Sequence, residues 1–386
     1  MKQHLKGVLY MAVAGLLFWL FLPEKYTVNM PFQFANSLSA EETLERLVIA
    51  DGFSMTGYAD KLSGARALAI TETGDLIVSR PNLGQLTLVF ADKNADGLSD
   101  GNKLLLKGLN RPHGIALHHG WLYIAETDAV LRIRYDAAAR KFLGTPRYII
   151  RDSFPGGGNH WSRTVKVGPD NKLYVSIGSS CNVCHENTPK RACILQYNLD
   201  GTNEVLFASG LRNTVGIDWD SSRKLYGVDN GRDLLGDDTP PEELNQINLG
   251  EHYGWPYEYG RQIADNDFAN TKPSQLKTSA PSHEMTAHSA PLSVLFPKHN
   301  TLLLNNTALV SLHGSWNRSE KSGYKIVALT ITPDKEIKQR DFITGFEHGG
   351  TVIGRPVDLV EDKLGNIYLS DDYSGRIYKI SATKSP

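Results

Sequence analysis

The sequence predicts an all-β fold, a six-bladed β-propeller of four-stranded antiparallel blades preceded by an N-terminal hydrophobic segment. One pattern recurs along most of the chain: a short alternating apolar strand, a polar turn and a second strand, usually followed by a further strand. Six such units over roughly 340 residues match the blades of a propeller around a central channel. Helical signals are scarce, and a sandwich would give even strand spacing without this repeated unit.

The repeating units share turns rich in Gly, Asp and Asn, which favour tight hairpins. The five clearest units are ARALAITETGDLIVSR (65–80), RPHGIALHHGWLYIAE (111–126), WSRTVKVGPDNKLYVSIG (161–178), LRNTVGIDWDSSRKLYGVD (211–229) and GRPVDLVEDKLGNIYLSDD (354–372). A sixth, more degenerate unit comprises TALVSLHGSWNR (307–318) and GYKIVALTIT (323–332).

Polar residues stand at or just before the first strand of several units. In a propeller the inner strands begin near the central axis, so these residues are expected to converge on one end of the channel. They are His113, His160, Arg212, Asn213 and Arg355. Such convergence would make one site from residues far apart in sequence.

The N-terminus reads as an export signal. Lys2 and Lys6 precede an uncharged apolar run from Gly7 to Leu22, the order of a secretory segment. No small-x-small cleavage site follows at once, so a cleaved signal peptide and an uncleaved signal anchor both stay open. We expect residues 1–22 to be this signal or anchor, 23–45 a linker and 46–386 the propeller. The body is then periplasmic or otherwise extracytoplasmic, and meets a membrane only through its N-terminal segment.

The net charge argues against one class of partner. With 386 residues and a formal charge of -1, the chain has no basic footprint for nucleic acid. A small-molecule partner is expected instead.

The densest polar stretch runs from Gly210 to Trp255, with Arg212-Asn213 just ahead of a strand-like VGIDW and a long acid-rich loop, DNGRDLLGDD, after it. A solvated surface loop is the plain alternative. Long loops carried by a rigid scaffold often form sites, and we expect one here.

Several long motifs, in order along the chain, support a family resemblance. GGGNHWSRTVKVGPDNKLYVSIG, GLRNTVGIDWD, the DNGRDLLGDD loop with LNQINLGEHYGWP, and the late HGSWNR and GRPVDLV segments are the motifs that carry it. Together they resemble the soluble quinoprotein glucose/sorbosone dehydrogenase family, and its sorbosone dehydrogenase branch most. The resemblance implies a propeller that holds pyrroloquinoline quinone (PQQ) over its channel, oxidises a sugar hydroxyl or aldehyde hydrate by hydride transfer to the quinone, and passes electrons to an external quinone or cytochrome.

The resemblance also implies roles for particular residues. His160 falls at the position of the family's general base, and imidazole suits proton transfer near neutral pH. Arg212 and Asn213 match the family's cofactor-facing pair, in which a guanidinium stabilises charge developing on the quinone. Gly231 and Arg232 lie where the family provides two backbone carbonyls to calcium, which prefers oxygen ligands.

The chain also departs from the glucose enzyme. Of the Lys and two Arg that clamp the cofactor's carboxylates there, only Arg355 aligns, and the Lys position falls near His313. A glutamine that assists the base has become part of LNRPHGIAL, which contains Arg111 and His113. With calcium, Arg212, Arg232 and Arg355 are the expected positive charges for the cofactor.

The cysteines allow more than one interpretation. Cys181-Asn-Val-Cys184-His185 is a literal C-x-x-C-H, the attachment signature of c-type haem. The sorbosone branch resembles this chain at the paired cysteines, which implies a Cys181–Cys184 disulfide. Free thiols or a metal site are the remaining alternatives.

A separate constellation has the spacing of a calcium loop. Asp92, Asn94, Asp96 and Asp100 supply oxygens at alternating positions with Gly97 at the turn. The closing Glu is absent, so a structural calcium site and a plain Asp/Gly turn both stay open.

Three function classes follow. The leading one is a PQQ-dependent sugar dehydrogenase. The others are a calcium-dependent propeller hydrolase acting on lactones or esters, and a non-catalytic binding propeller.

Overall fold

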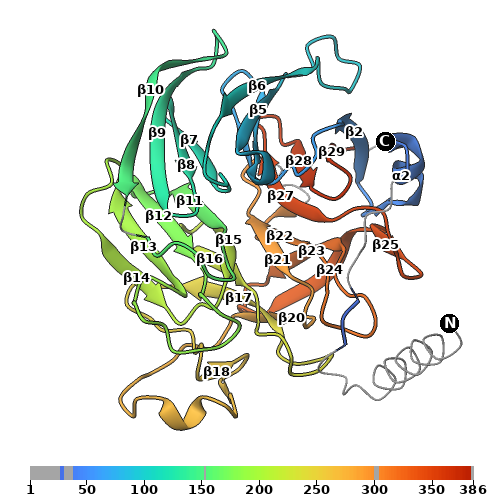
Figure 1. Cartoon of the computed structure of the whole chain (residues 1–386). Coiled ribbons are helices and arrows are strands. Elements are labelled where there is room, and N and C mark those ends of the chain that lie inside the picture. The colour runs from blue at the N-terminus through green and yellow to red at the C-terminus, as the bar shows by residue number, and fades with distance from the viewer. Residues whose placement is uncertain (1–26, 30–37, 152–153, 300–303, 384–386) are drawn as a thin grey trace, which may run out of the picture.

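The computed structural model of the protein describes residues 27–29, 38–151, 154–299 and 304–383 (Figure 1). Five antiparallel sheets of four strands and one of five surround a central axis. This arrangement confirms the predicted six-bladed propeller. No helix among these residues is long and apolar enough to cross a membrane. The segment 1–22, expected to be a signal or anchor, lies outside the described residues.

Each of the first three blades is a four-stranded meander. The first is β3 (Leu68–Ile70), β4 (Leu76–Arg80), β5 (Gln85–Val89) and β6 (Asn102–Lys107). The second is β7 (Ile115–His118), β8 (Trp121–Ala125), β9 (Ala129–Asp136) and β10 (Lys141–Arg151). The third is β11 (Arg163–Val167), β12 (Lys172–Ile177), β13 (Cys193–Asn198) and β14 (Val205–Ser209).

The later blades follow the same scheme with additions. The fourth is β15 (Thr214–Trp219), β16 (Leu225–Asp229), β17 (Glu242–Ile247) and β20 (His283–Met285). The fifth is β21 (Pro291–Leu295), β22 (Thr307–Leu312), β23 (Lys325–Ile331) and β24 (Ile337–Thr344), with β1 (Val48–Ile49) on its outer edge. The sixth is β27 (Pro356–Glu361), β28 (Ile367–Asp371), β29 (Arg376–Ala382) and β2 (Phe53–Ala59).

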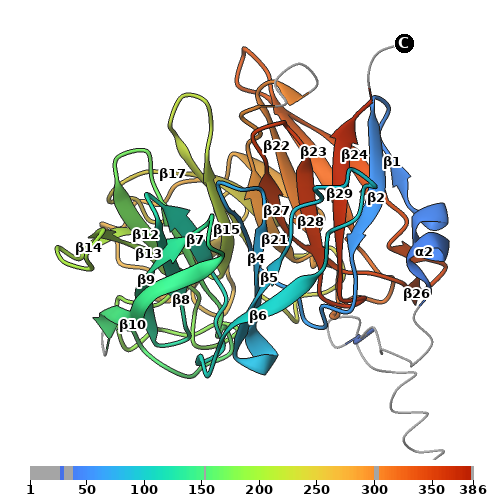
Figure 2. The ribbon, with the colours of Figure 1, turned by 90° about the horizontal axis from the view of Figure 1, so that it is seen from above.

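The two ends of the chain close the ring. β2 pairs antiparallel with β29, from Phe53 opposite Ala382 to Ala59 opposite Ile377, so the last blade is completed by an early strand (Figure 2). Helix α2 (Ala40–Arg46) begins within the range expected to be linker. Ser39 and Glu42 form its capping box, and Thr43 accepts a hydrogen bond from buried Arg376. The segment just before the first strands is thus tied to the sixth blade.

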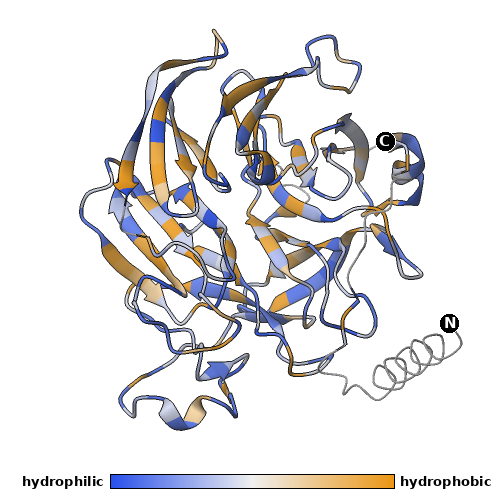
Figure 3. Ribbon diagram, in the orientation of Figure 1, coloured by the Kyte–Doolittle hydropathy of each residue, from blue (hydrophilic) through white to orange (hydrophobic). Residues whose placement is uncertain are grey.

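The core lies between neighbouring blades. Middle strands such as β12 and β16 are buried along almost their whole length, because another blade covers each face. Tyr123 of the second blade, for example, packs in one cluster with Val165 and Val175 of the third. Apolar residues accordingly fill most of the inner parts of the strands (Figure 3).

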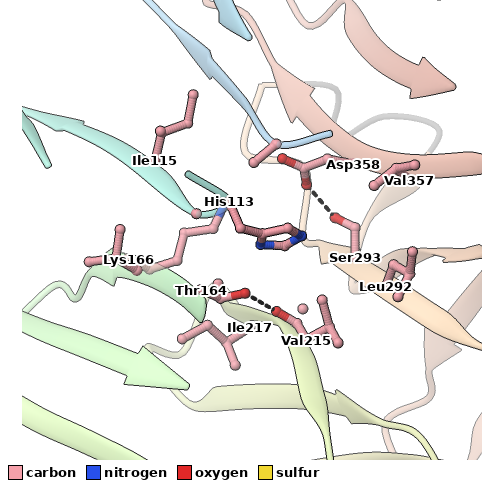
Figure 4. Close-up of a pocket in the computed structure, with 14 residues that line it drawn as sticks. His113, Ile115, Thr164, Lys166, Val215, Ile217, Leu292, Ser293, Val357 and Asp358 are labelled. Atoms are coloured by element: carbon pink, nitrogen blue, oxygen red, sulfur yellow. Dashed lines mark hydrogen bonds between the residues drawn. The ribbon is translucent and has the colours of Figure 1, made fainter. Parts of the chain in front are cut away.

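The inner strands β3, β7, β11, β15, β21 and β27 contact one another in a ring around the axis. Gly114 and Gly216 stand where these strands approach most closely; a Cβ on Gly114 would lie 2.5 Å from the backbone nitrogen of Val165. Figure 4 shows the channel between the inner strands, lined by His113, Thr164, Val215, Ser293 and Asp358 among others. Its cavity of about 30 Å³ has room for a few waters at most, so a larger ligand must bind at a mouth.

One mouth carries the longer loops. They include the β12–β13 loop, the β16–β17 loop and an insertion between β17 and β20 that contains β18 (Glu258–Tyr259), β19 (Ile263–Ala264) and the 3₁₀ turn η3 (Ala269–Thr271). The other short elements are η2 (Pro81–Leu83) and the hairpin β25 (Glu347–His348) with β26 (Thr351–Val352). Because the inner strands start at this mouth, the residues before them meet here.

Candidate active site

The residues that precede the inner strands form two groups at this mouth. We call the group on the third and fourth blades the acidic side; it comprises Arg212 and the oxygens around it, from Asn182, Asn230, Gly231, Asp233 and Glu242. We call the group on the other blades the basic side; it comprises Arg66, His113, His313, Arg355 and Asp372.

Arg212 is buried on the acidic side, with 5% of its surface exposed. Its guanidinium donates to five oxygens: Nε to Asn182 O (2.8 Å), Nη1 to Asn230 O (3.1 Å) and Gly231 O (2.7 Å), and Nη2 to Asn182 Oδ1 (2.8 Å) and Asp233 Oδ2 (3.2 Å). A guanidinium has five N–H donors, so every one has a partner within the chain. Any bond from Arg212 to a ligand must therefore share or replace one of these contacts.

His160 lies beside Arg212 with a fixed tautomer. Its Nδ1 is 2.9 Å from the carbonyl oxygen of Ser179. Because a carbonyl can only accept, Nδ1 carries the proton and Nε2 keeps its lone pair. Burial, and then the positive charge of Arg212, lower the pKa of His160 to about 3, so the imidazole is neutral at pH 7.

A glycine brings the predicted residues of this side together. A Cβ on Gly178 would lie 2.4 Å from Oδ1 of Asn213 and 2.6 Å from Cβ of His160, so both side chains press against the backbone of Gly178. The next residue, Ser179, donates its N–H to the carbonyl of Arg212 at 2.8 Å. The structure thus places His160, Arg212 and Asn213 around one short segment.

Two further arginines, which sequence reasoning missed, donate hydrogen bonds to the segment that carries His160. Arg163, fully buried, donates to the carbonyls of His160 (2.8 Å) and Pro155 (3.2 Å). Arg191 donates to the carbonyls of three consecutive residues, Pro155, Gly156 and Gly157. These contacts fix the segment 155–160.

Buried carboxyl groups back the acidic side. Glu242 accepts hydrogen bonds from the backbone nitrogens of Gly231 (2.7 Å) and Ala290 (3.0 Å), and burial raises its pKa to about 8. Asp229 accepts from the backbone nitrogens of Arg212 and Asn213, and burial raises its pKa to about 6. A cation bound nearby would favour the ionised form of both groups.

The two residues expected to offer carbonyls to calcium differ in their surroundings. The carbonyl of Gly231 faces Arg212, as described. The side chain of Arg232 is turned away from that group, with Nη1 within 2.8 Å of both carboxylate oxygens of Asp265 and Nη2 3.0 Å from Asp267. The charge of Arg232 is thus paired within the chain, and its role toward the cofactor stays a prediction.

The basic side is a chain of charged contacts across three blades. Asp372 accepts from Arg66 Nη1 at 2.7 Å and lies 2.9 Å from Nε2 of His313. Although burial opposes it, His313 and Arg66 hold the pKa of Asp372 well below its usual range. Arg355 donates to the carbonyl of His313 at 3.1 Å. The predicted residues His313 and Arg355 are thus neighbours.

Arg66 is a member that sequence reasoning missed. Its Nη2 lies 3.5 Å from Nε2 of the predicted residue His113, and its Nε is buried without a hydrogen-bond partner among the described residues. It stands two residues before β3, as Arg355 stands one before β27. Applying the same rule to the first repeating unit would have found it.

An aromatic ring links the two sides. Trp161 follows His160, and its ring packs edge-on against His113 with centroids 5.6 Å apart. Arg111 lies over the same ring at 3.9 Å. Arg111 has a left-handed φ of 50°, a strained conformation for a residue other than glycine. The ring of Trp161 therefore lies between His160, the proposed base, and His113 of the basic side.

Comparison with known proteins places the chain in a family. A family model described as TrAA12-like matches residues 47–260 and 256–383. The chain belongs to the TrAA12-like family. An uncharacterized protein of Borreliella burgdorferi is 31% identical over 362 residues, which cover 89% of this chain and 93% of that protein.

Two relatives of this TrAA12-like chain have named activities. The pyrroloquinoline quinone-dependent pyranose dehydrogenase of Coprinopsis cinerea is 25% identical over 424 residues, covering 92% of this chain but only 57% of that protein. The pyrroloquinoline quinone-dependent sugar dehydrogenase of Hypocrea jecorina is 24% identical over 385 residues, covering 86% of this chain and 88% of that protein.

Solved structures show the same fold. The calcium structure of the Trichoderma reesei enzyme of carbohydrate-active family AA12 has a TM-score of 0.76 at 21% identity, covering 90% of this chain and 100% of that one. The holo form of the PQQ domain of Coprinopsis cinerea pyranose dehydrogenase has a TM-score of 0.71 at 22% identity, covering 87% and 97%.

In this TrAA12-like chain Cys181 and Cys184 form a disulfide, with Cα atoms 6.2 Å apart. Nε2 of His185 lies 3.1 Å from Oγ1 of Thr271 in the insertion, and its ring contacts Phe268. Since haem attachment uses both thiols, the disulfide and the haem interpretation exclude each other. Cys193 is buried and free.

Most side chains of the loop with calcium-like spacing bond to the loop's own backbone, but Oδ1 of Asp92 is buried without a hydrogen-bond partner among the described residues. Asp92 accepts from the backbone nitrogen of Gly97, Asp96 from Leu98, and Asp100 from Lys93. Among the described residues, the one group of three His, Cys, Asp or Glu side chains with ligand atoms within 4.8 Å of one another is Cys181, Cys184 and Glu186. Calcium at Asp92, Asn94, Asp96 and Asp100 stays a prediction.

Proposed function

We propose that this TrAA12-like protein is a PQQ-dependent sugar dehydrogenase with His160 as its general base. The observation that carries the proposal is the mouth itself: a neutral, oriented imidazole stands between an oxygen-rich side and a cationic side. The named activities of the Coprinopsis and Hypocrea relatives support it.

The basic side fits the carboxylates of PQQ. Arg66 donates through Nη1 to Asp372, while among the described residues its Nη2 meets only the ring nitrogen of His113 at 3.5 Å, so the guanidinium has capacity for a carboxylate. Arg355 belongs to the same group, because it donates a hydrogen bond to the carbonyl of His313. His113 contacts Arg66 directly. Asp372 neutralises part of this charge, so the pair of arginines leaves a net positive side for a polycarboxylate.

The acidic side fits calcium, which takes oxygen ligands and accepts backbone carbonyls. The carbonyls of Asn230 and Gly231 and the carboxylate of Asp233 converge on the guanidinium of Arg212. These oxygens already surround a cation. The carbonyl oxygen of Gly231 already accepts a hydrogen bond from Arg212. A calcium ion bound to that oxygen would therefore share it with the guanidinium.

When bound, the quinone supplies the carbon that accepts hydride. The protein's part is to remove the proton of the sugar hydroxyl at Nε2 of His160, the nitrogen that Ser179 leaves free. The low pKa of His160 keeps this nitrogen unprotonated at neutral pH, at the expense of basicity. Arg212, fixed beside it, stabilises negative charge that develops on the ligand's oxygens.

We further propose that the substrate is a sugar or sugar-derived aldehyde of the sorbosone type and that the electrons leave to an external quinone or cytochrome. The order of charged and apolar residues in 1–22 supports a periplasmic or other extracytoplasmic location, with this segment as signal or anchor, 23–45 as linker and 46–386 as the catalytic body.

Reconstitution tests the proposed function. The protein is incubated with PQQ and calcium, and dye reduction is followed over a panel of aldoses, other pyranoses and sorbosone, with the calcium-only sample as control. We expect reduction only with quinone present. Hydrolysis of lactones or esters by the calcium-only sample would favour the hydrolase. If the protein neither reduces dye nor binds the quinone, the binding propeller is favoured instead.

A further inference from the structure

The disulfide loop 181–184 makes contacts that bear on Arg212. Asn182, enclosed between the two cysteines, accepts from Arg212 twice, through its backbone oxygen and through Oδ1, both at 2.8 Å. The same Oδ1 accepts from the backbone nitrogen of Asp233 at 2.8 Å, and Nδ2 donates to the carbonyl of Asp233 at 3.0 Å. One amide thus joins the third blade to Arg212 and to the acid-rich loop of the fourth.

The same loop reaches His160 from its other end. Oγ of Ser179 donates to the carbonyl of Cys181 at 2.7 Å and lies 2.9 Å from Nδ1 of His160. The disulfide therefore closes a short loop that contacts the supports of both functional side chains. A disulfide restricts the conformations open to the segment it encloses.

The loop is also fixed at its base. Glu186 accepts from the backbone nitrogen of Ser180 at 2.6 Å and from its hydroxyl at 2.8 Å. The loop is thus stabilised by contacts that do not involve Asn182. The three side-chain hydrogen bonds of Asn182 all go to Arg212 and Asp233. Asn182 is placed to orient Arg212 rather than to hold its own loop together.

We propose that Asn182, kept in place by the Cys181–Cys184 disulfide, is a positioning residue that sets the orientation of Arg212 at the mouth. Without the amide, Nη2 of Arg212 loses one of its two acceptors, and the loop that carries Asp233 loses both side-chain bonds to the third blade. The guanidinium would keep its bonds to the backbone carbonyls of residues 182, 230 and 231, but Nη2 would no longer be held between the amide and Asp233. The functional part of this inference rests on the proposed function; the placement of Arg212 does not.

The first test is therefore crystallographic and needs no cofactor. In the Asn182→Ala variant we expect the Nη2 end of the Arg212 guanidinium to turn from its wild-type orientation, while the fold and the disulfide persist. Asn366→Ala is the matched control, because Asn366 donates to Asp362 at 2.8 Å in the turn between β27 and β28, at the opposite end of the channel. Arg212 unmoved in Asn182→Ala would overturn the proposal.

The second test measures PQQ binding through quenching of tryptophan fluorescence, with calcium present. Loss of a hydrogen bond to a charged group is typically worth about 10-fold or more in affinity, so Asn182→Ala should raise the Kd of PQQ by about that factor. Asn366→Ala should leave it unchanged. In an Arg212→Met background, Asn182→Ala should change Kd by less than about twofold, because a residue acting through Arg212 has nothing left to position.

The disulfide is tested in the same assay by the Cys181→Ser/Cys184→Ser variant, which avoids reductants that would react with the quinone. We expect a rise in Kd that is not additive with Asn182→Ala. Full additivity would show an independent, merely structural effect and contradict the proposal. A wild type that fails to bind PQQ would instead refute the proposed function, and the crystallographic test would still decide the role of Asn182.

Discussion

Arg212 on the acidic side and Arg66 on the basic side differ in how many of their hydrogen-bond donors have partners. On the acidic side all five donors of Arg212 are bonded to oxygens of the chain, and buried carboxyl groups lie behind them. On the basic side Arg66 is paired with Asp372 but keeps a buried Nε without a partner among the described residues. Arg212 is thus held in place by the chain, whereas the guanidinium of Arg66 keeps hydrogen-bonding capacity.

The difference indicates where a charged ligand places its groups. The oxygens around Arg212 suit a cation that shares them with the guanidinium, and the positive charge of Arg66 suits an anion. A cofactor that carries carboxylates at one end and meets a metal at the other would span both sides. His160 and Trp161 lie between them, where a substrate would reach the cofactor.

The largest expected effect comes from the residue between the two sides. His160→Gln should lower turnover by about 10²–10⁴, the usual contribution of a positioned base. Quinone affinity should change little, because neither side is altered. His118→Gln, in the strand β7 at the far end of the channel, is the control. Steady-state dye reduction checks the result, and unchanged turnover would remove His160 from the mechanism.

Removing the positive charge of Arg66 tests the basic side. Arg66→Met should weaken PQQ binding by about 10–100-fold, because it removes a charge-assisted contact to a carboxylate. Arg223→Met, the same charge change at the opposite mouth, should have no effect. Fluorescence titration gives both dissociation constants. Equal affinities in the two variants would mean that the basic side does not hold the cofactor.

The pH dependence tests the electrostatics around His160. Burial and the charge of Arg212 lower its pKa to about 3, so the base form predominates at every pH above that value. The acid limb of kcat/KM should therefore lie well below the usual histidine pKa of ~6.5. Activity is measured from pH 4 to 8 with unfolding monitored in parallel. A limb near 6.5 would show that His160 is more solvated than its contacts imply.

Much of this arrangement follows from the sequence. The repeated strand and turn pattern predicts the six blades, and residues just before inner strands predict that His113, His160, Arg212 and Arg355 meet at one mouth. The rule works because a propeller places equivalent positions of each repeat around one axis. It missed Arg66 only because it was not applied to the first unit.

Other features have no local signal. Asn182 accepts from Arg212, 30 residues further along the chain. Arg163 and Arg191 both donate to the backbone carbonyl of Pro155. Nothing in the neighbouring sequence marks these partners. The pairing of Arg232 with Asp265 depends on an insertion folding back over the fourth blade. The last blade is closed by β2, which a sequence window cannot assign to β29. These are consequences of packing between elements.

The central claim is that calcium on the acidic side and PQQ on the basic side bind as linked ligands of one mouth. Thermal unfolding with and without each ligand tests it most directly. Saturation with PQQ at about 100 times its Kd should stabilise the folded state by roughly 2.7 kcal/mol when calcium is present, and the gain should shrink when calcium is chelated. A Tm indifferent to PQQ, with or without calcium, would contradict the account.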